Sequence, residues 1–448
     1  MISNFRAGLA VAVLGAVHVA APLRAQVPVV PEDGARPISL AEAIQLAHRN
    51  LPAVVTARGL ERTAAAASRS AYAAYFPSLT LNASSGRTQG VQFFQGQLIP
   101  LTGNPWNYNN GLLTQIDIFD GGRRWAEIKR ARATGDVADA TVIQSRFDAA
   151  LQVKQQYYAV LAAHENELAA KALLEQADQQ LKASAARVSA GVATKSDSLR
   201  SVIQVGNAQL AVLTAQNDRR VANAALTRFV GSTTTVTASL SDTAYTAPAM
   251  PTEQEFEQLV SHGPAVQVAE ANLQAARSAK SAQRSQFMPS LSLQYNYTLT
   301  QGSREFDRGN LVLFGGGNPN RQQMTFNFSM PLFNNLVREQ QAVQVDVALR
   351  NAEAQVRDAR LGARQLLEQQ LRSLNTAEAR VRVQLAAIAA AEEDLRVQQQ
   401  RYALGASTLL DLLTSQTQLN QARQALIQAR FDGRIARAQL STLIGREL

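Results

Sequence analysis

The residues best suited to chemistry lie in two short segments that share one spacing. Each segment has an arginine, a glycine four residues later, a threonine three after that, and an aspartate three after the threonine. The residues are Arg187, Gly191, Thr194 and Asp197 in the first segment, and Arg401, Gly405, Thr408 and Asp411 in the second. Glycine often ends a helix in a left-handed conformation, and threonine caps the helix that follows. We therefore predict two tight turns between helices, each with a carboxylate near a helix N-terminus.

The position of the two aspartates suggests a structural role. Asp197 and Asp411 fall in the first turn of the second helix, where a carboxylate interacts favourably with the helix dipole.

Motifs for catalysis are missing from the sequence. His48, His164 and His262 are isolated and lack metal-ligand spacing, and no nucleophile motif is present. Gly315-Gly316-Gly317 lacks the strand and helix that flank a phosphate-binding loop. We expect no catalytic residue, no metal site and no cofactor. No motif supports the further alternative of an enzyme that acts on the cell envelope.

Composition points to an exported helical protein. Residues 1–25 combine Arg6 with an alanine-rich apolar stretch and are predicted to be a signal peptide cleaved after Ala25, the alternative being a buried N-terminal helix. The chain has no cysteine, which excludes disulfides and an N-terminal lipid on cysteine. The net charge is +9, but the arginines are interspersed with acids along helices. We therefore expect solvated faces or contacts with anionic lipid, and no nucleic acid partner.

The sequence contains an internal repeat. Pro77-Ser78-Leu79 returns as Pro289-Ser290-Leu291, and the two turn segments keep the same register. We predict a first repeat at residues 26–231, a linker at 232–251 and a second repeat at 252–448. Each repeat is expected to open with helical residues, about 39–74 and 252–286.

Each repeat also contains a long stretch without proline, from Trp106 to Ala247 and from Leu332 to the end of the sequence. Because proline breaks helix interiors, these stretches can form very long helices. Apolar residues at alternating spacings of four and three, such as Leu367, Leu371 and Leu374, indicate a coiled-coil-like seam. We predict long antiparallel helical hairpins at about 122–230 and 335–445, whose first helices extend on the order of 100 Å.

Ahead of each helical hairpin, apolar and polar residues alternate, which predicts β-hairpins at about 78–119 and 290–332. One apolar and one polar face suit the wall of a transmembrane barrel, but four strands cannot close one. Three copies would supply twelve strands, an even number within the known range. The alternative is a fragment of a soluble β-sandwich.

These features resemble the outer membrane efflux protein family, the TolC-like channels. The resemblance rests on the repeated hairpin entry, the two turn segments, and the strand-to-helix junctions Ile118–Arg123 and Met330–Asn335. It implies a mainly α, internally duplicated fold: a homotrimer with a twelve-stranded outer-membrane β-barrel and a periplasmic α-barrel. It also implies a passive exit duct that works with a periplasmic membrane fusion (adaptor) protein and an inner-membrane pump. The alternative is a periplasmic coiled-coil adaptor or scaffold.

The resemblance also implies roles for the two turns. Asp411 matches a ring aspartate of the periplasmic constriction, and Tyr402, Ser196 and Asp197 match positions that link neighbouring helices. The sequence departs from the family pattern at Ser407, where an arginine is expected, and at Thr414, where a second aspartate is expected. The adaptor-docking surface implied at the two turns consists of Gly191, Val192, Ala193, Gly405, Ala406 and Ser407.

Overall fold

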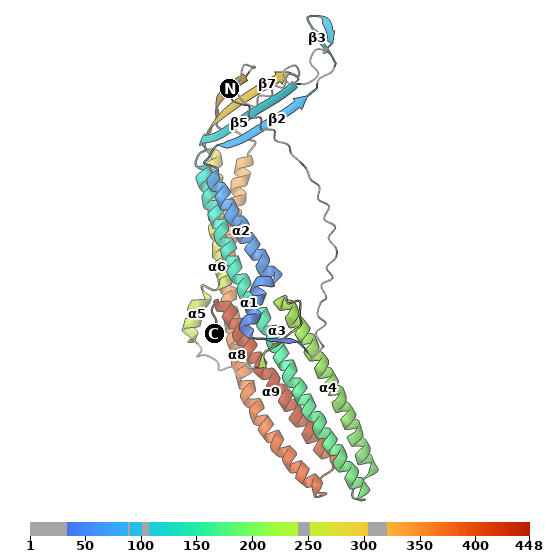
Figure 1. The fold of residues 1–448 in the computed structure, drawn as a ribbon. Helices are drawn as coiled ribbons and strands as arrows, with labels where there is room; N and C mark the ends of the chain where they lie inside the picture. The colour runs from blue at the N-terminus through green and yellow to red at the C-terminus, as the bar shows by residue number, and fades with distance from the viewer. Residues whose placement is uncertain (1–33, 88–89, 101–106, 241–250, 303–319) are drawn as a thin grey trace, which may run out of the picture.

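The molecule is elongated, with a β-sheet at one end and two long helical hairpins extending to the other (Figure 1). This computed structural model describes residues 34–87, 90–100, 107–240, 251–302 and 320–448. The predicted signal peptide therefore lies outside the described residues. None of the described helices combines the length and apolar character needed to cross a membrane.

The helical hairpins are matched in length. The first consists of α3 (Arg123–Ser189) and α4 (Lys195–Val230), and the second of α8 (Val337–Ala403) and α9 (Leu409–Ile444). The first helix of each pair has 67 residues and the second has 36. This internal duplication of long antiparallel helices confirms the predicted fold class.

The helical residues that open each repeat are divided in two by a proline. In the first repeat α1 (Leu40–Asn50) ends before α2 (Pro52–Ala73), and in the second α5 (Glu253–Val260) precedes α6 (Pro264–Arg284). Proline is favoured at the first position of a helix because its missing N–H is not needed there. A short 3-10 turn, η2 (Ser285–Phe287), follows α6.

The main sheet has four antiparallel strands in the order β2-β5-β7-β8. These are β2 (Ser78–Gly86), β5 (Asn107–Phe119), β7 (Ser290–Gly302) and β8 (Asn320–Ser329). Each repeat contributes one hairpin, and β5 and β7 join the repeats.

A small β-hairpin in the connection between β2 and β5 was not predicted. Strands β3 (Val91–Phe94) and β4 (Gln97–Pro100) pair across Gln95 and Gly96, which have positive φ angles of 48° and 83°. A two-residue turn of this kind matches the twist of the flanking strands. The glycines Gly315, Gly316 and Gly317 lie outside the described part of the chain.

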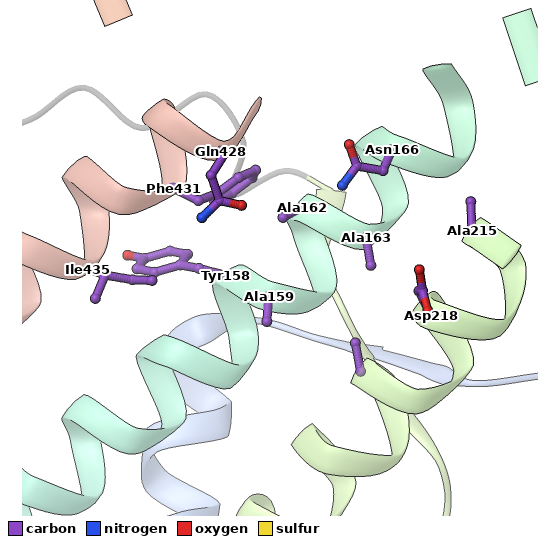
Figure 2. A pocket seen from close by; sticks show the side chains of 11 residues that line it. Tyr158, Ala159, Ala162, Ala163, Asn166, Ala215, Asp218, Gln428, Phe431 and Ile435 are labelled. Carbon is purple, nitrogen blue, oxygen red and sulfur yellow. The ribbon is translucent and has the colours of Figure 1, made fainter. Parts of the chain in front are cut away.

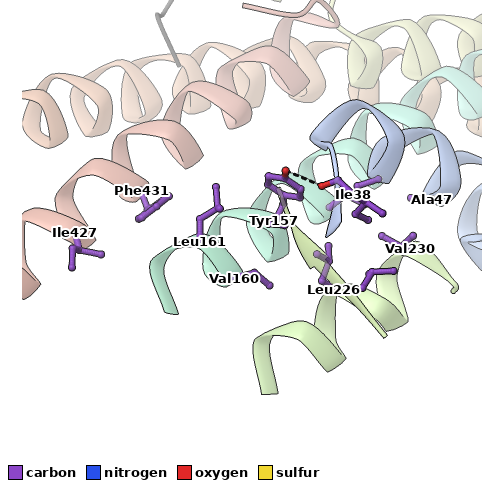
Figure 3. Packing of buried hydrophobic residues seen from close by; sticks show 13 residues of the cluster. Ile38, Ala47, Tyr157, Val160, Leu161, Leu226, Val230, Ile427 and Phe431 are labelled. Atoms are coloured by element: carbon purple, nitrogen blue, oxygen red, sulfur yellow. Dashed lines mark hydrogen bonds between the residues drawn. The ribbon is translucent and has the colours of Figure 1, made fainter. Parts of the chain in front are cut away.

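A compact core lies where the helical hairpins meet the N-terminal segment (Figure 3). Strand β1 (Arg36–Ile38) pairs in parallel with β6 (Val236–Ala238), so part of the predicted linker is a strand in this core. The fully buried hydroxyl of Tyr157 donates to the carbonyl of Ile38 at 3.1 Å and accepts from the N–H of Ser239 at 3.0 Å. Tyr157 thereby ties α3 to both segments.

Candidate functional site: the sheet face and the helical tips

One face of the main sheet is apolar across all four strands. Directly opposed residues point to the same face of a sheet. The register opposes Leu81 to Leu112 and Leu112 to Tyr297. The apolar face consists of Leu79 and Leu81 on β2, Leu112 and Ile116 on β5, Leu293, Tyr295 and Tyr297 on β7, and Met324, Phe326 and Phe328 on β8.

The opposite face carries mainly polar side chains. Opposed sets there include Thr80 with Leu113 and Asn296 with Gln323, and the other members are mostly Ser, Thr, Asn and Gln. On the apolar face, by contrast, Phe326 and Phe328 of the edge strand β8 are 60% and 69% exposed. These exposed side chains form a large apolar surface for a single chain. The sheet therefore has one side suited to lipid and one suited to water.

Both outer strands of this sheet have an open edge. Among the described residues, β2 pairs only with β5, and β8 pairs only with β7. Unpaired backbone groups at such an edge are ready to bind another strand.

The junction between sheet and helices brings the two repeats into contact. Gly121 has a φ of +64°, and a Cβ atom placed there would lie 2.2 Å from Cβ of Met288 in the other repeat. Neighbouring Gly122 has a φ of +82° with no atom within 4 Å of such a Cβ. Gly121 therefore serves close packing as well as backbone conformation.

Both aspartates of the two turns complete capping boxes. The carboxylate Oδ2 of Asp197 accepts from Thr194 N–H at 3.1 Å and from its hydroxyl at 2.8 Å. The corresponding distances from Thr408 to Oδ2 of Asp411 are 2.9 and 2.7 Å. These bonds from the Thr408 hydroxyl and N–H lower the pKa of Asp411, and the guanidinium of Arg401 contributes. The predicted cap role is therefore present in both turns.

Arg187 connects the two tips, a contact that sequence reasoning did not anticipate. Its Nη1 donates to the carbonyl of Tyr402 at 2.5 Å and to that of Ala403 at 3.3 Å. The guanidinium carbon lies 4.6 Å from the centroid of the Tyr402 ring, a cation–π contact. The signal available in the sequence was the arginine that begins each repeated segment.

Tyr402 lies between the tips and is only 9% exposed. Burial raises the pKa of its hydroxyl, while Arg187 opposes the rise and Asp197 adds to it. The hydroxyl has no hydrogen-bond partner among the described residues, and neither does the buried Oγ of Ser407. Three predicted site residues, Tyr402, Asp197 and Ser407, thus lie in the tip region.

The other predicted tip residues are at the surface. Ser196 is exposed beside Asp197, and Val192 is 64% exposed. Gly191 and Gly405 end their helices with φ angles of 74° and 76°, as the repeated spacing predicted. Ala193 is partly buried and Ala406 is exposed. Their assignments to a gate and to adaptor docking stay predictions.

The described part of the chain has no group of His, Asp or Glu residues arranged to hold a metal ion. A cavity of about 330 Å³ lies between α3, α4 and α9 (Figure 2). Five of its eleven lining residues are alanines, and the larger ones include Tyr158, Asn166 and Phe431. The cavity is a gap between packed helices.

Comparison with known proteins gives matches in both repeats. The family described as outer membrane efflux protein matches residues 43–232 and 256–446. Cobalt-zinc-cadmium resistance protein CzcC of Cupriavidus metallidurans is 27% identical over 178 residues, which are 40% of this chain and 43% of CzcC. Outer membrane protein TolC of Salmonella enteritidis is 22% identical over 158 residues, 35% of this chain and 32% of TolC. The matched stretches span less than half of either relative.

A solved structure extends the likeness to nearly the whole fold. The outer membrane protein VceC of Vibrio cholerae superposes with a TM-score of 0.73 at 20% identity, covering 91% of this chain and 96% of that chain. The family matches cover most of the chain, one to each repeat. The chain therefore belongs to the outer membrane efflux protein family, and it is an outer-membrane protein with a periplasmic helical extension and not an enzyme.

Proposed function

We propose that the chain is one third of a passive exit duct that crosses the outer membrane and extends through the periplasm. The observation that carries this proposal is the main sheet, which has one apolar face, one polar face and two open edges. Open edges are not tolerated in lipid, so the strands must pair with other copies. Three copies close a barrel of twelve strands whose polar faces enclose water.

The helices support the same assembly. On α4 the side chains of Leu199, Ile203, Leu210 and Leu213 are 55%, 64%, 63% and 62% exposed. Their spacing places them along one side of the helix, which is the pattern of a coiled-coil contact. This stripe is assigned to the interface between protomers. Membership in an outer-membrane family argues against the alternative of a periplasmic adaptor or scaffold.

The duct is proposed to close at the helical tips. Arg187 holds Tyr402 from the neighbouring hairpin, which offsets the absence of an arginine at Ser407. The Thr408 bonds to Asp411 both go to Oδ2. Oδ1 thus remains available to face the lumen, and one carboxylate can serve both as a cap and in a ring of three.

Cation selectivity in planar bilayers tests the ring. Asp411→Asn is expected to lower the preference for cations because it removes three charges from the constriction. Thr408→Ala is the matched control, since it weakens the cap and keeps the charge. Unchanged selectivity in Asp411→Asn would leave Asp411 with a capping role alone.

The tips are also proposed to dock a periplasmic adaptor that connects the duct to an inner-membrane pump. Val192 and Leu404 are 64% and 85% exposed, which gives each tip an apolar contact. Gly405→Pro is expected to impair adaptor-dependent export in cells while the protein still inserts in the outer membrane. Leu404→Ser tests the same contact with less effect on the turn. Normal export by both variants would remove the docking assignment.

A further inference from the structure

The two repeats enter their long helices through equivalent turns that differ in charge. The first turn is Asp120-Gly121-Gly122 and the second is Asn334-Asn335-Leu336. In each turn the last two residues have positive φ, 64° and 82° in the first and 55° and 62° in the second. Each turn is followed by a buried arginine, Arg124 or Arg338, with exposed fractions of 9% and 8%. Because the two backbones are alike, the first turn shows which partner the donors of the second turn need.

A carboxylate fills the first turn. Oδ2 of Asp120 accepts from the backbone N–H of Arg124 at 2.9 Å and from its Nε at 2.9 Å. Oδ1 of Asp120 accepts from the N–H of Gly122 at 3.1 Å. Negative charge is thus held between a guanidinium and the N-terminus of α3, both of which favour it.

The second turn has the same donors and no negative charge. Asn334 replaces the aspartate, and its buried Oδ1 has no partner among the described residues. Nε of Arg338 is likewise buried without a partner in that part of the chain. Within it the guanidinium donates only to backbone carbonyls, at 2.8 Å to Pro331 O and 3.3 Å to Leu332 O. In the described part of the chain no carboxylate pairs with Arg338, and no side chain caps α8.

An arginine keeps its charge in proteins, and a buried charge is costly unless an opposite charge compensates it. The ring of Phe287, 4.9 Å from the guanidinium carbon, covers one side of Arg338 but adds no full charge. The site at Asn334 and Arg338 therefore lacks the anion that Asp120 provides in the first repeat.

The surroundings of this turn indicate where an anion would come from. Leu332, Phe333 and Leu336 are 82%, 74% and 61% exposed. They lie between the end of β8 and the start of α8, at the boundary between the sheet and the periplasmic helices. Exposed apolar residues beside an anion site suit a molecule with a charged head and hydrocarbon chains.

We propose that the turn at residues 334–338 binds the phosphate group of a phospholipid in the inner leaflet of the outer membrane. The phosphate displaces the Asn334 side chain, and its oxygens then accept from Nε and the backbone N–H of Arg338, as the Asp120 carboxylate does at Arg124. The acyl chains lie along Leu332, Phe333 and Leu336. The lipid source rests on the proposed membrane position of the sheet, whereas the phosphate site itself does not.

Retention of phosphatidylglycerol by the detergent-purified protein, followed by native mass spectrometry, tests the proposal. Asn334→Asp builds the missing carboxylate into the turn, so retention is expected to fall at least about tenfold, the size of a lost charge-assisted contact. The same variant is expected to melt at a higher temperature in lipid-free detergent. Asp120→Asn is the matched converse, because it opens an equivalent site and is expected to increase retention.

Inorganic phosphate distinguishes the two sources. A rise in melting temperature with phosphate in the unmodified protein, lost in Asn334→Asp, together with no lipid retention would support the site and overturn the lipid. Equal lipid retention and equal phosphate response in both proteins would overturn the site. Channel conductance in planar bilayers is a separate readout: its absence in the unmodified protein would count against the exit duct and leave the phosphate response unaffected.

Discussion

At the scale of single residues, the aspartates of the two turns show how a chemically suggestive group can first serve the fold. Asp411 and Asp197 lie in the first turn of the second helix, as the spacing predicted, and each also accepts from the threonine that precedes it. The contact at Arg187 could not be predicted, because the Tyr402 carbonyl it binds belongs to a different repeat. Sequence spacing reports local hydrogen bonds, whereas contacts between distant segments depend on how the helices pack.

The lowered pKa of Asp411 predicts a pH-dependent stability. The pKa lies below the reference of 3.8 in the folded protein, so the carboxylate stabilises the fold above about pH 4. This contribution is lost as the pH falls through the lowered value. Asp411→Asn is expected to melt below the unmodified protein at pH 7 and to approach it at low pH, in thermal unfolding followed by circular dichroism.

Thr408→Ala removes the threonine cap and keeps the carboxylate of Asp411, so its stability is compared with that of Asp411→Asn. Loss of a threonine cap costs about 1 kcal/mol, so this variant is expected to be less stable at neutral pH. If Asp411→Asn differed from the unmodified protein equally at pH 7 and at low pH, the carboxylate would not be the source of the stabilisation.

At the scale of elements, the strand-to-helix junction predicts different outcomes for two adjacent glycines. Gly121→Ala places a Cβ against Met288 and is expected to cost roughly 2–4 kcal/mol from strain and overpacking. Gly122→Ala meets no atom within 4 Å and is expected to cost about 1–2 kcal/mol. Melting temperatures of the two variants check this order, and equal losses would contradict the proposed role of Met288.

The sequence predicted the regular elements well and their exceptions poorly. The long proline-free stretches identified α3 and α8, and the period of two identified the strands of the main sheet. The pairing of β1 with β6 was missed, because three-residue strands carry no periodic signal. The left-handed conformation of Leu336 was also missed, since a leucine rarely adopts it and its counterpart is glycine.

At the scale of the whole molecule, the repeat predicts how neighbouring copies pair. Within the chain, Thr114 of β5 opposes Tyr295 of β7. The matching positions in the other repeat are Phe328 of β8 and Ala83 of β2, which lie at the open edges. If three copies close a barrel with the same register, Phe328 of one copy opposes Ala83 of the next.

Cysteine cross-linking measures this register directly, because the chain has no cysteine of its own. Directly opposed residues lie within disulfide range, so Phe328→Cys with Ala83→Cys is expected to give covalent trimers under oxidising conditions. Phe328→Cys with Leu79→Cys is the control, displaced by four residues or about 13 Å along the strand. Trimers from the displaced pair alone would reject the predicted register.

The equal lengths of the helices have a consequence for evolution of the cell envelope. The 67-residue helices α3 and α8 each rise about 100 Å. Lengthening one hairpin alone would leave its tip protruding beyond the other and separate Arg187 from Tyr402. If the proposed duct reaches partners at the other membrane, a lineage whose two membranes moved apart would have to insert matching turns into all four helices.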